Sequence, residues 1–277
     1  MLKDITLGQY FPGNSIAHKL DPRTKILLVT LYIIALFSAK GWTGYAVMAV
    51  TLAACVKVSH VGLRALVRGL KPLVFIIAFT GILNMFFTPD THYLWEWGIL
   101  RVSVKGIENA LFMVIRIMLL VMGTFLMTYT TSPIRLTDGL ESLLNPLKKI
   151  HVPVHELAMM MSIALRFIPI LIEETDKIMK AQMARGADFE HGNIIKRAKS
   201  MVPLLVPLFV SAFRRADDLA MAMEARCYNG GEGRTKMKPL VYEKDDKIAY
   251  LFIFAFLAVV IVLRILLPVN LGNLIFR

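Results

Sequence analysis

One stretch of the sequence decides the fold class: residues 107–129 read IENALFMVIRIMLLVMGTFLMTY. Only two charged residues, Glu108 and Arg116, interrupt this apolar run. A helix of this length crosses the roughly 30 Å hydrocarbon core of a bilayer. Residues 248–269 form a second run of the same kind. We therefore expect a helical membrane protein, and the 56% hydrophobic content of the 277-residue chain agrees with that class.

Three more spans follow from the remaining apolar stretches. Residues 26–56 are broken only around Lys40-Gly41. A lysine in the middle of one long span would lie deep in lipid, so this stretch predicts a tight hairpin of two short helices. Residues 72–87 add another span. The expected fold is all-α, with about five transmembrane helices and long cytoplasmic helices between the fourth and fifth spans.

The distribution of basic residues predicts the orientation. Segments 1–25 and 57–71 hold eight Lys and Arg residues, whereas the segments on the opposite side hold four. Cytoplasmic loops are enriched in Lys and Arg, so we expect a cytoplasmic N-terminus. The eight are Lys3, Lys19, Arg23, Lys25, Lys57, Arg64, Arg68 and Lys71.

This orientation divides the chain into three regions. Residues 1–130 hold an N-terminal tail and four transmembrane helices, residues 131–247 form a cytoplasmic region, and residues 248–277 form the C-terminal transmembrane helix. The cytoplasmic region holds 18 Lys and Arg against 15 Asp and Glu. This near balance gives no basic stripe, so the net charge of +12 does not predict a nucleic-acid partner.

The cytoplasmic region contains two apolar runs, Leu157–Ile172 and Met201–Phe213, and each continues into a charged helical stretch. Such helices are typical of segments that begin against a membrane-embedded body and end on a soluble partner. The two stretches also resemble each other at an offset of 41 residues. Asp176-Lys-Ile-Met-Lys-Ala-Gln-Met-Ala-Arg-Gly186 aligns with Asp217-Asp-Leu-Ala-Met-Ala-Met-Glu-Ala-Arg-Cys227.

Each aligned stretch ends in an arginine between two small residues. Arg185 lies between Ala184 and Gly186, and Arg226 lies between Ala225 and Cys227. Small neighbours leave a guanidinium uncrowded and let another backbone approach. The alternative is a charge that only complements the helix dipole at a C-terminus. Two matched arginines in a duplicated context favour a docking role.

Four further stretches are informative when taken together with these two ends. They are Tyr10-Phe-Pro-Gly-Asn-Ser15, His18-Lys-Leu-Asp-Pro-Arg-Thr-Lys25, Ala164-Leu-Arg-Phe-Ile-Pro169 and Glu224-Ala-Arg-Cys-Tyr228. Together, over nearly the whole chain, they resemble the transmembrane T component of energy-coupling factor (ECF) transporters, the CbiQ/EcfT family, in which the two arginine ends are the paired X-Arg-X motifs. Cys227 stands where the family commonly has glycine, a small-for-small exchange.

The resemblance implies a non-enzymatic coupling subunit in the cell membrane of a prokaryote, part of an importer for vitamins or other micronutrients. Two ABC-type ATPases, which bind ATP and Mg, would dock at Arg185 and Arg226. A separate membrane protein, the S component, would capture the substrate. The chain itself is then expected to bind no cofactor or metal.

The apolar halves of the two long helices are candidates for contact with the S component. The candidate residues are Met159, Met160, Met161, Arg166, Pro169, Pro203 and Pro207. Methionine-rich surfaces repack around different partners, and core filling is the equal alternative. The prolines could be hinges, or they could only set helix starts and bends.

Two other functions remain as alternatives. A conventional ABC importer permease would carry a Glu-Ala-Ala…Gly coupling signature, which the sequence lacks. A membrane-embedded hydrolase would use Glu173 and Glu174 with a histidine, but Lys177 stands where an arginine would complete the motif. His151 and His155 have the i, i+4 spacing of a helical metal site, but Pro153 between them argues against a single helix, so both are expected to be solvated loop residues.

Two charged positions near the spans carry structural expectations. Arg116 lies about ten residues into its span, where an interhelical pair is the favoured interpretation. Asp21-Pro22-Arg23-Thr24-Lys25 is expected to begin a helix, with its basic residues at the level of the lipid headgroups.

Overall fold

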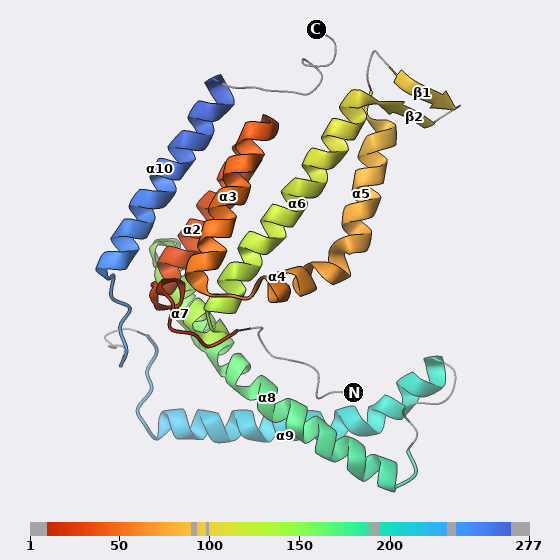
Figure 1. Cartoon of the computed structure of the whole chain (residues 1–277). Coiled ribbons are helices and arrows are strands. Elements are labelled where there is room, and N and C mark those ends of the chain that lie inside the picture. The colour runs from red at the N-terminus through yellow and green to blue at the C-terminus, as the bar shows by residue number, and fades with distance from the viewer. Residues whose placement is uncertain are drawn as a thin grey trace. The chain divides into compact units, whose positions relative to one another are not determined.

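The computed structural model describes residues 10–89, 93–97, 100–187, 189, 194–231 and 237–266. In this part of the chain the regular structure is helical apart from a two-stranded antiparallel ribbon, β1 (Tyr93–Trp97) and β2 (Leu100–Ser103), which was not predicted (Figure 1). Contacts divide the chain into two units. We call residues 9–139 with 240–277 the bundle unit, and residues 1–8 with 140–239 the crossed-helix unit.

The helices are divided between the two units. The bundle unit holds α1 (Ile16–Lys19), α2 (Pro22–Ser38), α3 (Gly41–Ser59), α4 (Leu63–Leu70), α5 (Val74–Phe87), α6 (Val104–Thr130) and α10 (Lys244–Leu266). The crossed-helix unit holds α8 (Val154–Ala184), α9 (Ile194–Glu224) and a 3-10 turn, Asn145–Ile150. Helix α7 (Pro133–Leu144) runs from one unit into the other.

The predicted helical hairpin is confirmed by α2 and α3. Helix α2 begins at Pro22, and the Asp21 carboxylate accepts a hydrogen bond from the Arg23 backbone N–H at 2.8 Å. This is the expected N-cap, with proline at the first helical position. Helix α3 begins at Gly41, whose φ of +69° suits glycine, so the chain reverses within two residues.

The expected span at residues 72–87 corresponds to α5, and it is preceded by a separate short helix. Helix α4 ends at Leu70, and Lys71–Leu73 form a 3-10 turn that contains Pro72. Proline lacks a backbone N–H and interrupts the α-helical ladder. In Figure 1, α4 accordingly turns away from the direction of α5.

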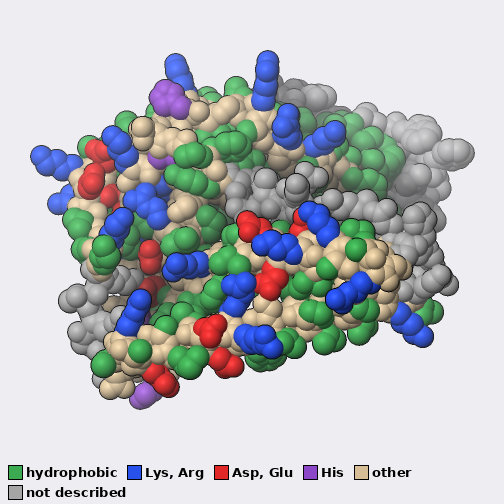
Figure 2. Space-filling model, turned by 90° about the horizontal axis from the view of Figure 1, so that it is seen from below, with side chains coloured by type: hydrophobic (Ala, Val, Ile, Leu, Met, Phe, Trp, Pro, Cys, Tyr) green, Lys and Arg blue, Asp and Glu red, His purple; other side chains and the backbone are tan. Residues whose placement is uncertain are grey.

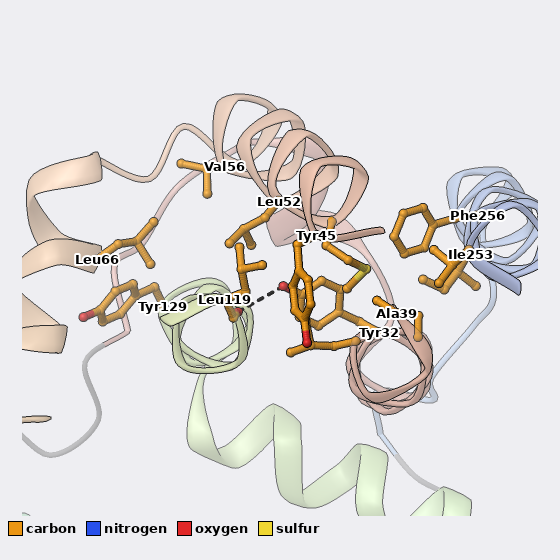
Figure 3. Packing of buried hydrophobic residues seen from close by; sticks show 14 residues of the cluster. Tyr32, Ala39, Tyr45, Leu52, Val56, Leu66, Leu119, Tyr129, Ile253 and Phe256 are labelled. Atoms are coloured by element: carbon orange, nitrogen blue, oxygen red, sulfur yellow. Dashed lines mark hydrogen bonds between the residues drawn. The ribbon is translucent and has the colours of Figure 1, made fainter. Parts of the chain in front are cut away.

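The core of the bundle unit is built from side chains of α2, α3, α4, α6 and α10 (Figure 3). Tyr32 lies at its centre, and its hydroxyl donates a hydrogen bond to the Leu119 carbonyl at 3.0 Å. Gly123 leaves room for this ring, because a Cβ there would come within 2.4 Å of it. Ile253 and Phe256 bring α10 against α2, although more than two hundred residues separate the two helices.

By length and composition, five helical segments are long and apolar enough to cross a membrane: α3, the segment Leu63–Phe87 that comprises α4, the 3-10 turn and α5, and helices α6, α8 and α10. The predicted number of spans is therefore confirmed, but the set differs. Helix α2 has 17 residues and is missing from this set. Helix α8, whose apolar run was expected to be too short or too charged to span, is one continuous helix of 31 residues and belongs to it. Seventeen residues still lie at the lower end of the range that spans a bilayer.

The Asp21 end of the bundle is held by buried charged groups. Asp246 is 1% exposed and accepts hydrogen bonds from the backbone N–H groups of Asp21 and Glu243 at 2.9 and 2.8 Å. Lys25 is 5% exposed and is therefore buried within the protein, while its level relative to the lipid headgroups stays a prediction. Its ammonium donates to the carbonyls of His18 and Thr130 and to the Thr131 hydroxyl. These bonds join the start of α2 to the end of α6.

Candidate functional site on two crossed helices

The first predicted docking arginine, Arg185, lies at the C-cap of α8. Gly186 follows with φ +91°, and its N–H donates to the Met183 carbonyl at 3.0 Å. The N–H of Ala187 donates to the Gln182 carbonyl, also at 3.0 Å. This pair of bonds is a Schellman motif, which satisfies helix-end carbonyls with backbone N–H groups.

The second arginine, Arg226, occupies the same position at the end of α9. Cys227 follows with φ +54°, and its N–H donates to the Glu224 carbonyl at 2.8 Å. The N–H of Tyr228 donates to the Met223 carbonyl at 3.0 Å. The duplicated sequence therefore has a duplicated backbone geometry, with an arginine displayed one residue before a left-handed position.

The left-handed backbone conformation gives a physical reason why a small residue follows each arginine. A left-handed conformation costs a residue with a Cβ roughly 1 kcal/mol or more, and glycine adopts it freely. No other heavy atom lies within 4 Å of a Cβ built on Gly186. The left-handed conformation therefore favours glycine after each arginine, and Cys227 adopts it with a Cβ. The small-for-small exchange at Cys227 stays a prediction.

Both arginines are exposed. In the described part of the chain, neither guanidinium forms a hydrogen bond or an ion pair, and the helix-end carbonyls are bonded by backbone N–H groups instead. A role in direct capping of the carbonyls is thus already filled by the backbone. The two guanidinium groups remain available to a partner's carboxylates, with which arginine forms strong bidentate contacts.

Helices α8 and α9 pack against each other and cross (Figure 1). At the crossing, Glu174 accepts hydrogen bonds from the Ser211 hydroxyl and from the Arg215 guanidinium, the latter at 2.8 Å. Closer to the end of α8, the Gln182 side-chain amide donates to the Pro203 carbonyl at 3.4 Å. The register shows that the two helices run antiparallel through their contact.

The Glu174–Arg215 ion pair joins equivalent positions of the duplication. Residues 174 and 215 differ by the same 41 positions as the two arginines, so each arginine lies 11 residues beyond the ion pair on its own helix. We call residues 174–185 of the first helix and residues 215–226 of the second the two arms. At 1.5 Å per residue, each arm is about 16 Å long. Sequence reasoning missed this pair, although opposite charges at aligned positions 174 and 215 were a usable signal.

The candidates for S-component contact lie on exposed parts of α8 and α9. Met160 is 55% exposed, Met161, Arg166 and Pro169 are also exposed, and Met159 is half-buried. On α9, Pro203 and Pro207 are exposed beside a stripe of large apolar side chains that includes Val202, Val206, Phe209 and Phe213. Both helices continue through their prolines, and the hinge role stays a prediction.

The residues proposed for a hydrolase are not brought together. Glu173 is exposed, and Glu174 is engaged at the crossing. His155 was expected to be solvated, but it lies on α8 and its Nδ1 is 2.9 Å from Glu141 Oε1. His151 is exposed at the end of the 3-10 turn. Among the described residues, no group of three or more His, Cys, Asp or Glu is placed to hold a metal ion.

The charged residue within the fourth predicted span, Arg116, has a partner on another helix. Arg116 Nε donates a hydrogen bond to the Tyr45 hydroxyl on α3 at 2.8 Å, so the predicted interhelical pair is confirmed, although the sequence did not identify Tyr45. On the face drawn in Figure 2, acidic side chains lie among the basic ones, and hydrophobic side chains separate them.

Comparisons with known proteins identify the relatives of this chain. The family model for cobalt transport protein (CbiQ) matches residues 13–237. The energy-coupling factor transporter transmembrane protein EcfT of Thermosediminibacter oceani is 57% identical over 90% of this chain and 94% of its own length. The EcfT proteins of Clostridium kluyveri and Bacillus subtilis are 54% and 47% identical, over 96% and 95% of this chain and 98% and 100% of their own lengths.

Proposed function

Because the chain belongs to the CbiQ/EcfT family and is the transmembrane T component of an ECF transporter, we propose that Arg185 and Arg226 dock two ATPase subunits. Each arginine enters an acidic groove on one ATPase, with Ala184 and Gly186, or Ala225 and Cys227, allowing close approach of the partner's backbone. ATP and Mg are bound by the ATPases, and this chain contributes no catalytic group.

One observation carries the proposal: two exposed arginines follow the same helix-end geometry at matched distances from the α8–α9 crossing. Two related ATPase subunits present two related grooves, and two equivalent arms suit such a pair. A guanidinium that meets a carboxylate at a partly desolvated interface forms a contact whose loss costs about 2–5 kcal/mol.

The two helices then transmit motion. ATP binding closes the two ATPases and changes the distance between their grooves, so the arms move about the crossing at Glu174 and Arg215. The exposed apolar halves of α8 and α9 carry this displacement to an S component, which captures a vitamin or another micronutrient. Met159–Met161, Arg166, Pro169, Pro203 and Pro207 form the contact surface.

The proposed function implies a position for each part of the chain relative to the membrane. The protein lies in the cell membrane of a prokaryote with its N-terminus in the cytoplasm, as the basic residues of segments 1–25 and 57–71 indicate. The 131–247 region faces the cytoplasm. Helix α8 is long and apolar enough to cross a bilayer, but its second half carries Glu173, Glu174 and Asp176, which favour water.

Co-purification with the ATPases tests the docking role. The chain is expressed with two ATPases of an ECF transporter, as wild type and as Arg185→Glu with Arg226→Glu. The double variant is expected to lose both ATPases. The matched control is Lys177→Glu with Arg214→Glu, which makes the same charge change on exposed residues of the same helices and should retain both. Retention by the docking variant, or equal loss in the control, would contradict the proposal.

A further inference from the structure

We propose that the bundle unit binds an anionic phospholipid in a groove beside the turn between α3 and α4. The groove has a volume of about 1020 Å³. Residues 11–16 and His18 line one side, and residues 57–62 with Arg64 and Ala65 line the other. We call this the α3–α4 groove. Its size is at the upper end of the range for small-molecule sites.

The N-terminal wall of the groove is fixed by hydrogen bonds. The Phe11 N–H donates to the Tyr129 carbonyl at 3.0 Å, which ties the wall to the end of α6. The buried His18 ring bridges the segment, because Nδ1 accepts from the Ser15 hydroxyl at 2.6 Å and Nε2 donates to the Phe11 carbonyl at 3.0 Å. Gly13 packs on this ring, where a Cβ would come within 2.8 Å. The groove is therefore a built feature of the fold.

The lining of the groove is amphipathic. Phe11, Ile16 and Val58 expose large apolar surfaces, and Lys57 and Arg64 supply positive charge. Neither of these two basic side chains has a hydrogen bond or ion pair within the described ranges. The lining contains no Asp or Glu, and the sequence has no acidic residue between Asp21 and Asp90. Two basic side chains beside the exposed apolar surface of Phe11, Ile16 and Val58 match the phosphate and the acyl chains of a phospholipid.

Helix α4 extends the same surface. Leu63 and Val67 are 67% and 58% exposed, and they lie beside the exposed Arg64 and Arg68. A helix with exposed apolar and basic residues suits the boundary between lipid headgroups and acyl chains. Helix α4 also joins α3 to α5, both of which belong to apolar segments of membrane-spanning length. The groove thus lies where such segments end, at the level of the headgroups.

Two other occupants have part of the required chemistry. Inorganic phosphate matches the charges of Lys57 and Arg64 but would leave the exposed apolar side chains of the groove uncovered. An ATPase or S component could cover the groove, but the lining shows the combined apolar and cationic character of a lipid site. The positive-inside rule explains the side on which these basic residues lie, but it does not explain a groove built around two of them.

Lipid titration of the purified full-length protein tests the proposal. Phosphatidylglycerol, phosphatidylcholine and inorganic phosphate are added separately in detergent, and binding is followed by native mass spectrometry and thermal melting. The variant is Lys57→Gln with Arg64→Gln. The control is Lys40→Gln with Lys105→Gln, two exposed lysines outside the groove. Both pairs remove two positive charges.

We expect phosphatidylglycerol to bind and stabilise the wild type more than phosphatidylcholine does. The groove variant should bind it about 25-fold more weakly, because each basic residue near an anionic lipid surface contributes roughly a five-fold factor. The control variant should bind it as the wild type does. Equal weakening in the control, or equal stabilisation by inorganic phosphate, would overturn the proposal. So would unchanged binding of phosphatidylglycerol by the groove variant, because Lys57 and Arg64 would then make no contact with the lipid.

Discussion

The residue that follows each docking arginine is constrained by its backbone. Gly186 and Cys227 both have positive φ, +91° and +54°. Sequence comparison shows that both residues are small, but it does not show the dihedral angle that makes glycine favourable. The two helix ends therefore differ in stability, because the left-handed conformation costs free energy at Cys227, which has a Cβ, but not at Gly186.

We therefore predict opposite effects of two substitutions. Cys227→Gly should stabilise the end of α9 by about 0.5–1 kcal/mol, and Gly186→Ala should destabilise the end of α8 by about 1 kcal/mol. Hydrogen exchange of the Tyr228 and Ala187 amides, which close the two motifs, measures these changes. Gly62→Ala is the control, because φ of Gly62 is −63°. Unchanged exchange of the Ala187 amide in Gly186→Ala would contradict the account.

Lys25 shows a second limit of sequence reasoning. Beside Arg23 at the start of an apolar helix, a lysine is typical of the headgroup region. Its burial depends on acceptors at Thr130 and Thr131, more than a hundred residues away. Only the folded chain brings these oxygens to the ammonium, so the local sequence could not predict the arrangement.

Removal of this ammonium should destabilise the bundle unit. Lys25→Met leaves buried acceptors without donors, at a cost of about 2–4 kcal/mol. For a chain of this size, the melting temperature should fall by roughly 5–10 °C. Lys19→Met, at an exposed position nearby, is the control and should melt as the wild type does. Equal melting of the Lys25 variant and the control would show that the buried hydrogen bonds contribute nothing.

At the scale of elements, α8 and α9 form a pair of equivalent helices. The 41-residue offset was visible in the sequence and predicted the two arginine ends. The crossing was not predicted, because local patterns do not define which faces of two helices meet. The structure places Glu174 against its own equivalent, Arg215, with Ser211 as a further donor.

A charge exchange at the crossing tests this pairing. Arg215→Glu brings two carboxylates together and should lower the melting temperature, and addition of Glu174→Arg should restore most of the loss. A partly exposed ion pair predicts a coupling energy of about 1 kcal/mol in the double-mutant cycle. The control is the same exchange between Asp176 and Lys180, a pair within α8 in which Lys180 is exposed, with a smaller expected effect. Additive effects at 174 and 215 would contradict the pairing.

At the scale of the whole molecule, hydrophobic length predicted most of the spans. The apolar runs located α3, α5, α6 and α10, and Lys40-Gly41 located the hairpin. Hydrophobic length does not predict contacts between residues that are far apart in the sequence, such as the packing of α10 on α2 and the hydrogen bond from Tyr32 to Leu119. Helix α4 and the β1–β2 ribbon were also missed, because each is too short to give a clear periodic signal.

The central claim is that two equivalent arginines each dock one ATPase, and the subunit composition of single variants tests it most directly. Arg185→Glu and Arg226→Glu are each co-expressed with both ATPases, and native mass spectrometry counts the subunits retained. The account predicts that each variant loses a different ATPase and keeps the other when the two ATPases are distinguishable by mass. Retention of both ATPases in either single variant would contradict it.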